Sequence, residues 1–407
     1  MKAHYEKVIC VCCFLALFCN IGLASTSFSV YQPYIVAIPG VGDAGGSMVQ
    51  STRILVSMVA MIFVDRYYRL LDVRLGTTLA TVLVALAFLV YSFADSLPLL
   101  LLGAFIAGLA YGLGGMISTT MLVNRWFRSG IGTAIGFSSV GSGVAFMVIP
   151  FMATRLAESV SLAAAFRAES LIAIVLAAII FTFMRNRPSD LGLEPYGIDP
   201  RQKKGKRKPP ATEPVSVSAV ARRALIVTMV LVGAVSMSAM QYYSVLLVSQ
   251  GFDVHFAAML LSVSGICLTF SKFAMGELFD RAGGPRATVF TFSLLLAGLV
   301  LCCLTSAAGE AGAIAAALLV GAGLCIGSVG ISVWSLQLSD AEHRTKSIKN
   351  CQVAYAFGGF AMTALPGPLK ELTGTYVTAY VLLVVLAACA ATMILILYRK
   401  NYQSICS

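Results

Sequence analysis

The sequence has 407 residues, of which 58% are hydrophobic and only 12% are charged. Because soluble domains carry about 25% charged residues, this composition excludes an ordinary soluble protein and indicates a chain solvated mainly by lipid. The net charge of +11 would suit a nucleic-acid-binding protein, but the basic residues are spread over the loops that flank apolar runs. We therefore expect no nucleic acid among the partners.

Apolar runs of about 20 residues, the length that a helix needs to cross a bilayer, recur along the whole chain. They predict an all-α membrane protein with twelve transmembrane helices, which places both termini on the same side. The predicted spans are residues 8–38, 46–65, 76–94, 97–123, 130–154, 164–184, 224–248, 255–279, 287–306, 311–337, 347–369 and 375–398.

Residues 185–223 interrupt this series with prolines, glycines and a cluster of Lys and Arg at 203–208. Such a composition is typical of a flexible linker. It predicts an N-terminal six-helix half at 1–184 and a C-terminal six-helix half at 224–407. The basic cluster is expected to contact anionic lipid headgroups.

Most of the 29 basic residues fall in the linker, at the termini and in the loops on the same side of this arrangement. This asymmetry follows the positive-inside rule. It predicts a multi-pass protein of the cytoplasmic (cell) membrane with both termini and the linker in the cytoplasm. The two basic residues that are assigned to neither side, Arg53 and Lys272, lie inside spans.

Lys272 stands in the stretch SKFAMGELFDRAGGPR, residues 271–286, about two turns before the end of the eighth span. A cation at that depth is costly in hydrocarbon and calls for a functional reason. We interpret it as a substrate-binding cation. The alternative is that its long side chain extends to the cytoplasmic interface.

The two halves repeat one another weakly, since Asp65-Arg66 in the second span matches Asp280-Arg281 in the eighth. Lys272 lies eight residues before its aspartate and Arg53 lies twelve before its own. The difference is one helical turn, so both cations fall on the same face of related helices. Arg53 is therefore a second candidate for substrate binding, with a purely structural ion pair as the alternative.

Two stretches that combine aromatic and polar residues provide further candidates beside Arg53 and Lys272. Tyr31 and Gln32 flank Pro33 in the first span, where proline is expected to bend the helix, and Gln241 and Tyr242 echo them in the seventh. We predict that these four side chains orient the substrate. The alternative is an interfacial aromatic belt.

Glycines at four-residue spacing, such as Gly108 with Gly112 and Gly132 with Gly136, and nearby Gly141, mark the fourth and fifth spans. Their spacing favours close approach of helix backbones. We interpret them as packing residues.

No Asp, Glu or His lies in the middle of a predicted span, whereas proton-coupled carriers commonly place one there. An electropositive cavity favours anion exchange or facilitated anion movement over proton symport. The chain also lacks catalytic motifs such as Gly-x-Ser-x-Gly and His-Glu-x-x-His, so it is not expected to be an enzyme. Three isolated histidines and unpatterned cysteines give no reason to expect a metal or another cofactor.

Twelve spans, a basic central loop and the motif Gly-x-x-x-Asp-Arg-x-Gly-x-x-Arg at 276–286 resemble the major facilitator superfamily. The first-half copy of the motif departs from the pattern at Met61 and Tyr68, which predicts a local difference in helix packing. The resemblance implies a gating role for the loop-motif residues and an ion pair of Glu277 beside them. The residues concerned are Asp65, Arg66, Gly276, Glu277, Asp280, Arg281, Gly283 and Arg286.

The stretch 124–136, NRWFRSGIGTAIG, and Arg187-Pro188-x-Asp190-x-Gly192-Leu193 further resemble the oxalate/formate antiporters and monocarboxylate transporters. These families bind a carboxylate through a basic residue of the eighth span, at the position of Lys272. The oxalate carriers also use a lysine in the eleventh span, where this chain has Phe357.

The resemblance implies a monomeric secondary transporter that moves small organic anions, mono- or short dicarboxylates, by alternating access. The alternative is an efflux transporter for amphipathic drugs or other small solutes.

Overall fold

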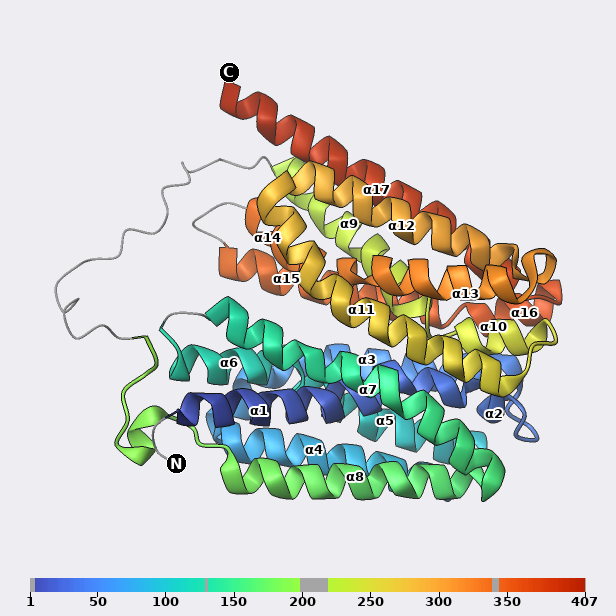
Figure 1. Cartoon of the computed structure of the whole chain (residues 1–407), viewed down its shortest axis with the longest axis horizontal. Coiled ribbons are helices and arrows are strands. Elements are labelled where there is room, and N and C mark those ends of the chain that lie inside the picture. Colours follow the sequence, from blue (N-terminus) through green and yellow to red (C-terminus); the bar gives the residue numbers. More distant parts are fainter. Residues whose placement is uncertain (1–3, 129–130, 198–218, 339–343, 407) are drawn as a thin grey trace. The chain divides into compact units, whose positions relative to one another are not determined.

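The structure, a computed structural model, describes residues 4–128, 131–197, 219–338 and 344–406, nearly all of them helical (Figure 1). Contacts divide these residues into two units. The first holds residues 4–28 and 56–197, and the second holds 29–55 and 219–406, so that one helix, α3 (Gly42–Leu70), contributes to both. The basic cluster at 203–208 lies outside the described residues, and the division into halves at the linker stays a prediction.

Eleven helical segments within the described residues are long and apolar enough to cross a membrane. They correspond to eleven of the twelve predicted spans. The remaining one, predicted at 347–369, is helical as α15 (Arg344–Thr363), but it starts with basic residues and α16 (Pro366–Thr373) begins anew after it. Its apolar stretch is therefore short. The predicted class, an all-α membrane protein, is confirmed.

In the first unit α4 packs against both α5 and α8, while α7 packs against α1 and the π-helical segment η1. Figure 1 shows α4 and α8 side by side. The elements of this unit, besides its share of α3, are α1 (Tyr5–Leu17), η1 (Phe18–Thr26), α4 (Val73–Tyr91), α5 (Leu97–Gly114), α6 (Met116–Trp126), α7 (Ile131–Ser159), α8 (Leu162–Phe183) and η3 (Pro188–Leu191).

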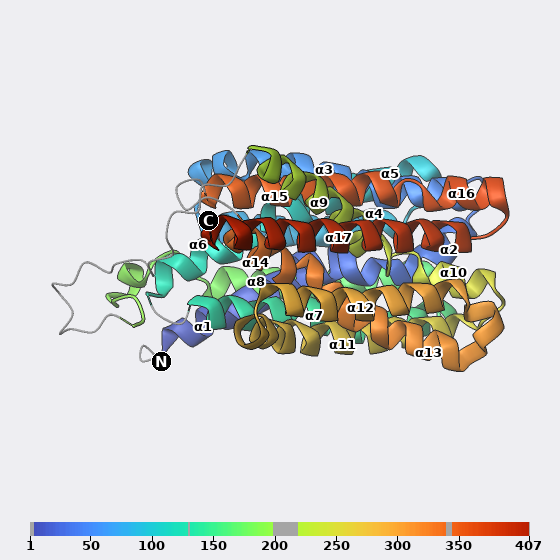
Figure 2. The ribbon, with the colours of Figure 1, turned by 90° about the horizontal axis from the view of Figure 1, so that it is seen from above.

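In the second unit α15 packs along α9, and α12 packs between α13 and α17. Figure 2 shows α11, α12 and α13 lying alongside one another. Its elements, besides its share of α3, are η2 (Ser27–Tyr31), α2 (Gln32–Val36), α9 (Ala219–Ser238), α10 (Tyr243–Ser249), α11 (Val254–Ala282), α12 (Gly284–Cys303), α13 (Thr305–Gly323), η4 (Leu324–Gly327), α14 (Val329–Gln337), α15, α16 and α17 (Val377–Cys406).

Besides the eleventh, four predicted spans are interrupted helices, and these four are every third span of the series. The first changes to π and 3-10 geometry over 18–31, and the fourth breaks at Gly115. The seventh breaks at 239–242, and the tenth passes through η4. Interrupted membrane helices expose backbone carbonyls, which are tolerated only where protein or a water-filled cavity surrounds them.

Glycines allow close helix contacts, as their spacing suggested. Cβ atoms at Gly112 and Gly141 would collide with the backbone of Ser57 and Phe14 respectively. Apart from the backbone of its own helix and its chain neighbours, no described atom lies within 4 Å of the place that a Cβ would take at Gly136, so this glycine makes no close contact with another described helix.

Candidate functional site

Arg53 is the most deeply buried cation that the sequence singled out, with an exposed fraction of only 2%. It lies on the part of α3 that belongs to the second unit. Its Nη2 donates to Oε1 of Gln50 at 2.6 Å and to Oε1 of Gln241 at 2.8 Å. Both partners are neutral amides, so these two contacts leave the positive charge of the guanidinium in place.

Gln50 extends this set to a third glutamine. Its Nε2 donates to Oε1 of Gln32 at 3.1 Å, so Gln32, Gln50, Arg53 and Gln241 form one hydrogen-bonded chain. We call these four residues the Arg53 cluster. Gly46 keeps room for it, because a Cβ there would lie 2.7 Å from Nε2 of Gln32.

Two members of the Arg53 cluster sit at helix breaks. Gln32 begins α2 directly after the 3-10 turn, and Gln241 lies between α9 and α10. The predicted bend at Pro33 is instead a break before it, because Pro33 stands in the first turn of α2, where proline is tolerated. The side-chain contacts of Gln32 and Gln241 are therefore made from positions at helix breaks and not from within regular helices.

Tyr31 and Tyr242, which are the sequence neighbours of Gln32 and Gln241, are both buried. Tyr31 is fully buried. Tyr242 donates from its hydroxyl to the carbonyl of Thr363 at 2.5 Å, and the same oxygen lies 3.2 Å from Oγ of Ser47. Neither tyrosine forms an interfacial belt, since both lie inside the unit.

A polar group at the start of α3 went unnoticed in the sequence. Asp43 pairs with Nζ of Lys370 at 3.0 Å and accepts a hydrogen bond from the hydroxyl of Tyr376 at 2.5 Å. The amide of Ala44 donates to Glu371 at 2.9 Å. We call these five residues the outer clamp. No periodic pattern marks them, because they come from turns and helix ends far apart in the chain.

Burial, and after it the hydrogen bond to Asp43 and the charge of that carboxylate, raise the pKa of Tyr376 above its ordinary value. The phenol therefore stays protonated and continues to donate to Asp43. Ser47, one turn further along α3, accepts a hydrogen bond from the amide of Gly367 at 2.7 Å. The start of α3 is thus held to α16 by both side chains and backbone.

Lys272, the other predicted cation, is half-buried on α11. Its electrostatic neighbour is Cys325 of η4, which lies at the break of the tenth span. Phe357, at the position where the oxalate carriers have lysine, is 49% exposed on α15.

The loop motif lies at the turn between α11 and α12. Gly283 separates the two helices with a φ of 80°, a conformation that side-chain-bearing residues rarely adopt. Glu277 pairs with Arg281 one turn later at 2.5 Å, and both side chains are exposed, as is Arg286. The surroundings of Gly276 and the side chain of Asp280 lie outside the described set.

In the first-half copy, Asp65 and Arg66 are exposed on α3. Tyr68, which replaces a glycine of the motif, is buried and donates from its hydroxyl to the carbonyl of Leu113 at 2.8 Å. This contact accounts for the predicted local difference in helix packing, because the tyrosine spans the gap to α5.

One acid inside a span was passed over in the sequence. Glu169 lies in α8, near the start of the span predicted at 164–184, and is fully buried. It stands close enough to Cys19 for an electrostatic interaction. The expectation of spans without an internal acid therefore needs correction, because a position near a span's end can still be deep in the packed unit.

The family model described as the Major Facilitator Superfamily matches residues 13–363. The chain belongs to the Major Facilitator Superfamily. It is thus a multi-pass membrane protein and a secondary transporter rather than an enzyme, as predicted. Comparison with curated protein sequences finds no significant match.

Solved structures share the superfamily fold over nearly the full length. A mutant form of the nucleoside transporter NupG has a TM-score of 0.74 at 12% identity, covering 96% of this chain and 100% of its own. A D-xylose–proton symporter has a TM-score of 0.75 at 10% identity, covering 97% of both chains. A bacterial homolog of the human lysosomal transporter Spinster has a TM-score of 0.68 at 15% identity, covering 98% of both. At such identities the likeness concerns the fold alone.

Proposed function

We propose that this superfamily member transports small organic anions, namely mono- or short dicarboxylates, with Arg53 as the central substrate-binding cation. The observation that carries the proposal is the burial of Arg53 among glutamines. A guanidinium taken out of water is costly unless its charge is compensated. The two glutamine oxygens that Nη2 contacts are neutral, so they orient the group toward an incoming carboxylate without neutralising it.

Arginine is well suited to this role because its planar fork matches the two oxygens of a carboxylate. The Arg53 cluster holds that fork through Nη2. Gln32 and Gln241, at helix breaks, add amide groups that orient a polar substrate. Tyr31 and Tyr242 are proposed to line the same region.

Lys272 is proposed as a second cation on α11. Its register with Arg53 across the two related Asp-Arg pairs supports a common function, and its half-buried position leaves it reachable from a cavity. Two cations would suit a short dicarboxylate, and one would suffice for a monocarboxylate. A cationic drug would be repelled by either group, so buried Arg53 disfavours the alternative of cationic drug efflux.

Transport would proceed by alternating access, as exchange or facilitated movement. The outer clamp has to open whenever the start of α3 leaves α16, so Asp43 and Lys370 would separate in each cycle. We propose that the loop-motif residues, exposed at the other end of α3 and α11, take part in gating. The protein is proposed to act as a monomer in the cytoplasmic membrane with both termini in the cytoplasm, where residues 203–208 meet anionic lipid.

The test is counterflow in proteoliposomes with labelled formate, lactate, oxalate, malonate and succinate. One of these anions should accumulate when the vesicles contain the same anion unlabelled. Arg53→Gln and Lys272→Gln should each abolish accumulation, whereas Arg155→Gln, which removes an exposed arginine at the end of α7, should not. Absence of flux for every anion in folded protein would reject the proposal, and neutral and cationic solutes would then be tested.

A further inference from the structure

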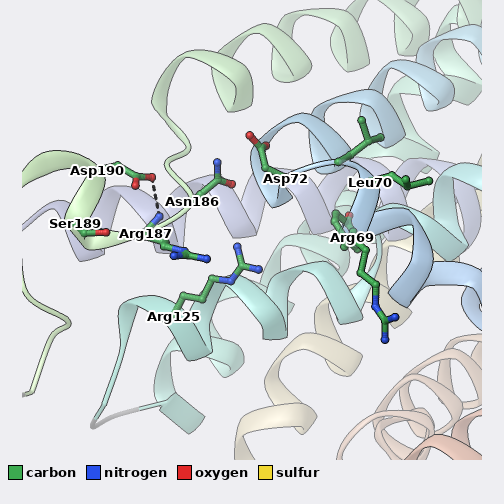
Figure 3. A pocket seen from close by; sticks show the side chains of 10 residues that line it. Arg69, Leu70, Asp72, Arg125, Asn186, Arg187, Ser189 and Asp190 are labelled. Atoms are coloured by element: carbon green, nitrogen blue, oxygen red, sulfur yellow. Dashed lines mark hydrogen bonds between the residues drawn. The ribbon is translucent and has the colours of Figure 1, made fainter.

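A second cationic feature lies in the first unit, whereas the Arg53 cluster belongs to the second. It is a pocket of about 430 Å³ at the ends of α3 and α6 and in the segment that follows α8. This volume is within the range of small-ligand sites. Its lining includes three arginines, Arg69, Arg125 and Arg187, with Asn186 beside them (Figure 3).

The arginines around the end of α8 divide into two kinds. Arg74 donates from Nε to the carbonyl of Phe181 at 2.7 Å, and Arg185 donates from Nη1 to two carbonyls of the last turn. These two satisfy the helix end. In contrast, within the described part of the chain no acceptor receives a hydrogen bond from the guanidinium of Arg69, Arg125 or Arg187.

Figure 3 shows the side chains of Arg125, from α6, and Arg187, from the start of η3, extending so that their guanidinium groups end in the same region of the pocket. Two guanidinium groups directed at the same space repel each other unless an anion lies between them. The lining also holds two carboxylates, which together with its three arginines leave a net charge of +1, and each of them accepts a hydrogen bond from a backbone amide. Asp72 accepts from the amide of Leu75 at 2.8 Å, and Asp190 accepts from the amide of Arg187 at 3.0 Å.

The segment that carries Arg187 is firmly built. The indole of Trp126 donates to the carbonyl of Arg185 at 3.0 Å, and Tyr196 exchanges backbone hydrogen bonds with Trp126 and Arg128, each at 2.8 Å. Gly192 closes the short helix η3 with a φ of 69°. The Arg-Pro-x-Asp-x-Gly stretch noted in the sequence therefore serves to hold an arginine at the pocket, next to the last turn of α6.

We infer that this pocket binds a phosphate monoester, with Arg125 and Arg187 as its two principal ligands. A phosphate monoester carries a charge near −2 at neutral pH. Its terminal oxygens accept forked hydrogen bonds from arginines on two sides, which a carboxylate cannot do equally well. The amide of Asn186 is placed to donate as well, since its Oδ1 already accepts from the amide of Arg74 at 2.9 Å.

The phosphate group could belong to a lipid headgroup or to a soluble ester. Leu70, which lines the pocket and is 79% exposed at the end of a membrane-crossing helix, favours a lipid. Two probes separate these sources. Dioleoyl phosphatidic acid carries the monoester on a lipid, and glycerol 3-phosphate carries it in water, with dioleoyl phosphatidylcholine as the lipid without a monoester.

The experiment is native mass spectrometry of the full chain in detergent with each probe. We expect one bound monoester per wild-type chain and no such binding of phosphatidylcholine, which lacks the monoester. Arg125→Gln and Arg187→Gln should each weaken binding about tenfold, the effect of losing one charge-assisted pair. The matched control is Arg128→Gln, which removes a neighbouring exposed arginine outside the pocket and should change binding less than about twofold.

Binding of phosphatidic acid alone would identify the lipid source, and binding of glycerol 3-phosphate as well would identify a soluble one. Failure of both probes to bind wild-type protein, or equal binding by wild type and both pocket variants, would overturn the inference. A measurement without variants guards against misfolding. Bound monoester should slow modification of Arg125 and Arg187 by phenylglyoxal in wild-type protein but not that of Arg128, and uniform modification would also overturn it.

Discussion

Nη2 of Arg53 donates a hydrogen bond to Oε1 of Gln241 at 2.8 Å, although 188 positions separate the two residues in the sequence. The contact joins the second predicted span to the break of the seventh. The sequence indicates a role for both residues on different grounds, because Arg53 is a cation inside a span and Gln241 belongs to a stretch of polar and aromatic residues. Their contact makes the Arg53 cluster a single unit that variants can test.

Gln241→Glu should abolish anion transport by neutralising Arg53. The new carboxylate has nearly the same shape as the amide and would form a charge-assisted bond with the guanidinium. A substrate carboxylate would then have to displace it, so we expect kcat/KM for counterflow to fall at least about 100-fold, or about 2.7 kcal/mol. Gln50→Glu should act in the same way, because Gln50 contacts the same Nη2 atom.

The control for these variants is Gln250→Glu. Gln250 also accepts a side-chain hydrogen bond, from Thr305, but it lies at the end of α10 and outside the Arg53 cluster. It should leave counterflow within about twofold of wild type. Normal transport by folded Gln241→Glu protein would show that Arg53 does not bind the substrate.

The outer clamp should control access to the start of α3. Lys370→Met removes the ion pair with Asp43 and leaves that carboxylate with the Tyr376 hydroxyl. We expect a membrane-impermeant maleimide to modify Ser47→Cys several-fold faster in the Lys370→Met background, as quantified by peptide mass spectrometry. Arg155→Gln, which removes an exposed charge elsewhere, should have no such effect.

Tyr376→Phe, which removes the other contact of Asp43, should also accelerate the modification of Ser47→Cys, and the pH dependence of this effect tests whether the phenol stays protonated. Because the pKa of Tyr376 is raised by burial and by Asp43, its phenol remains a donor at neutral and mildly alkaline pH. The acceleration caused by Tyr376→Phe, measured relative to wild type, should therefore stay constant between about pH 6 and pH 9. An effect that disappears at the alkaline end would mean that the phenol ionises there.

Much of the fold followed from apolar periodicity, and much of the site did not. Hydropathy predicts where helices cross, but it does not show where they break, and Gln32 and Gln241 take their positions from such breaks. Gln50 was missed because an uncharged glutamine inside a span carries little signal. Asp43 and Lys370 were missed because charges in turns are common. Glu169 was missed because it lies near the start of its predicted span, and a position in the sequence does not show how deeply a side chain is buried.

Glu169 offers a test of how transport is coupled. We predict that exchange needs no titrating acid, so Glu169→Gln should retain counterflow within about twofold. An inward proton gradient should then stimulate uptake by neither wild-type nor variant protein. Stimulation of the wild type that is lost in Glu169→Gln would contradict the prediction, and it would assign the coupling proton to α8.

The packing of α9 on α15 should tolerate no side chain at its two crossing glycines. A Cβ at Gly233 would collide with the carbonyl of Tyr355, and one at Gly358 would collide with the carbonyl of Val230. Because backbone atoms cannot move aside as a flexible side chain does, Gly233→Ala should lower the free energy of unfolding by about 1–3 kcal/mol. The matched control is Gly136→Ala, where no atom of another described helix lies within 4 Å and alanine should improve helix propensity by up to about 1 kcal/mol. Thermal unfolding in detergent should therefore show a lowered Tm for Gly233→Ala and an unchanged or raised Tm for Gly136→Ala. Equal Tm values for the two variants would show that the α9–α15 contact is looser than the structure indicates.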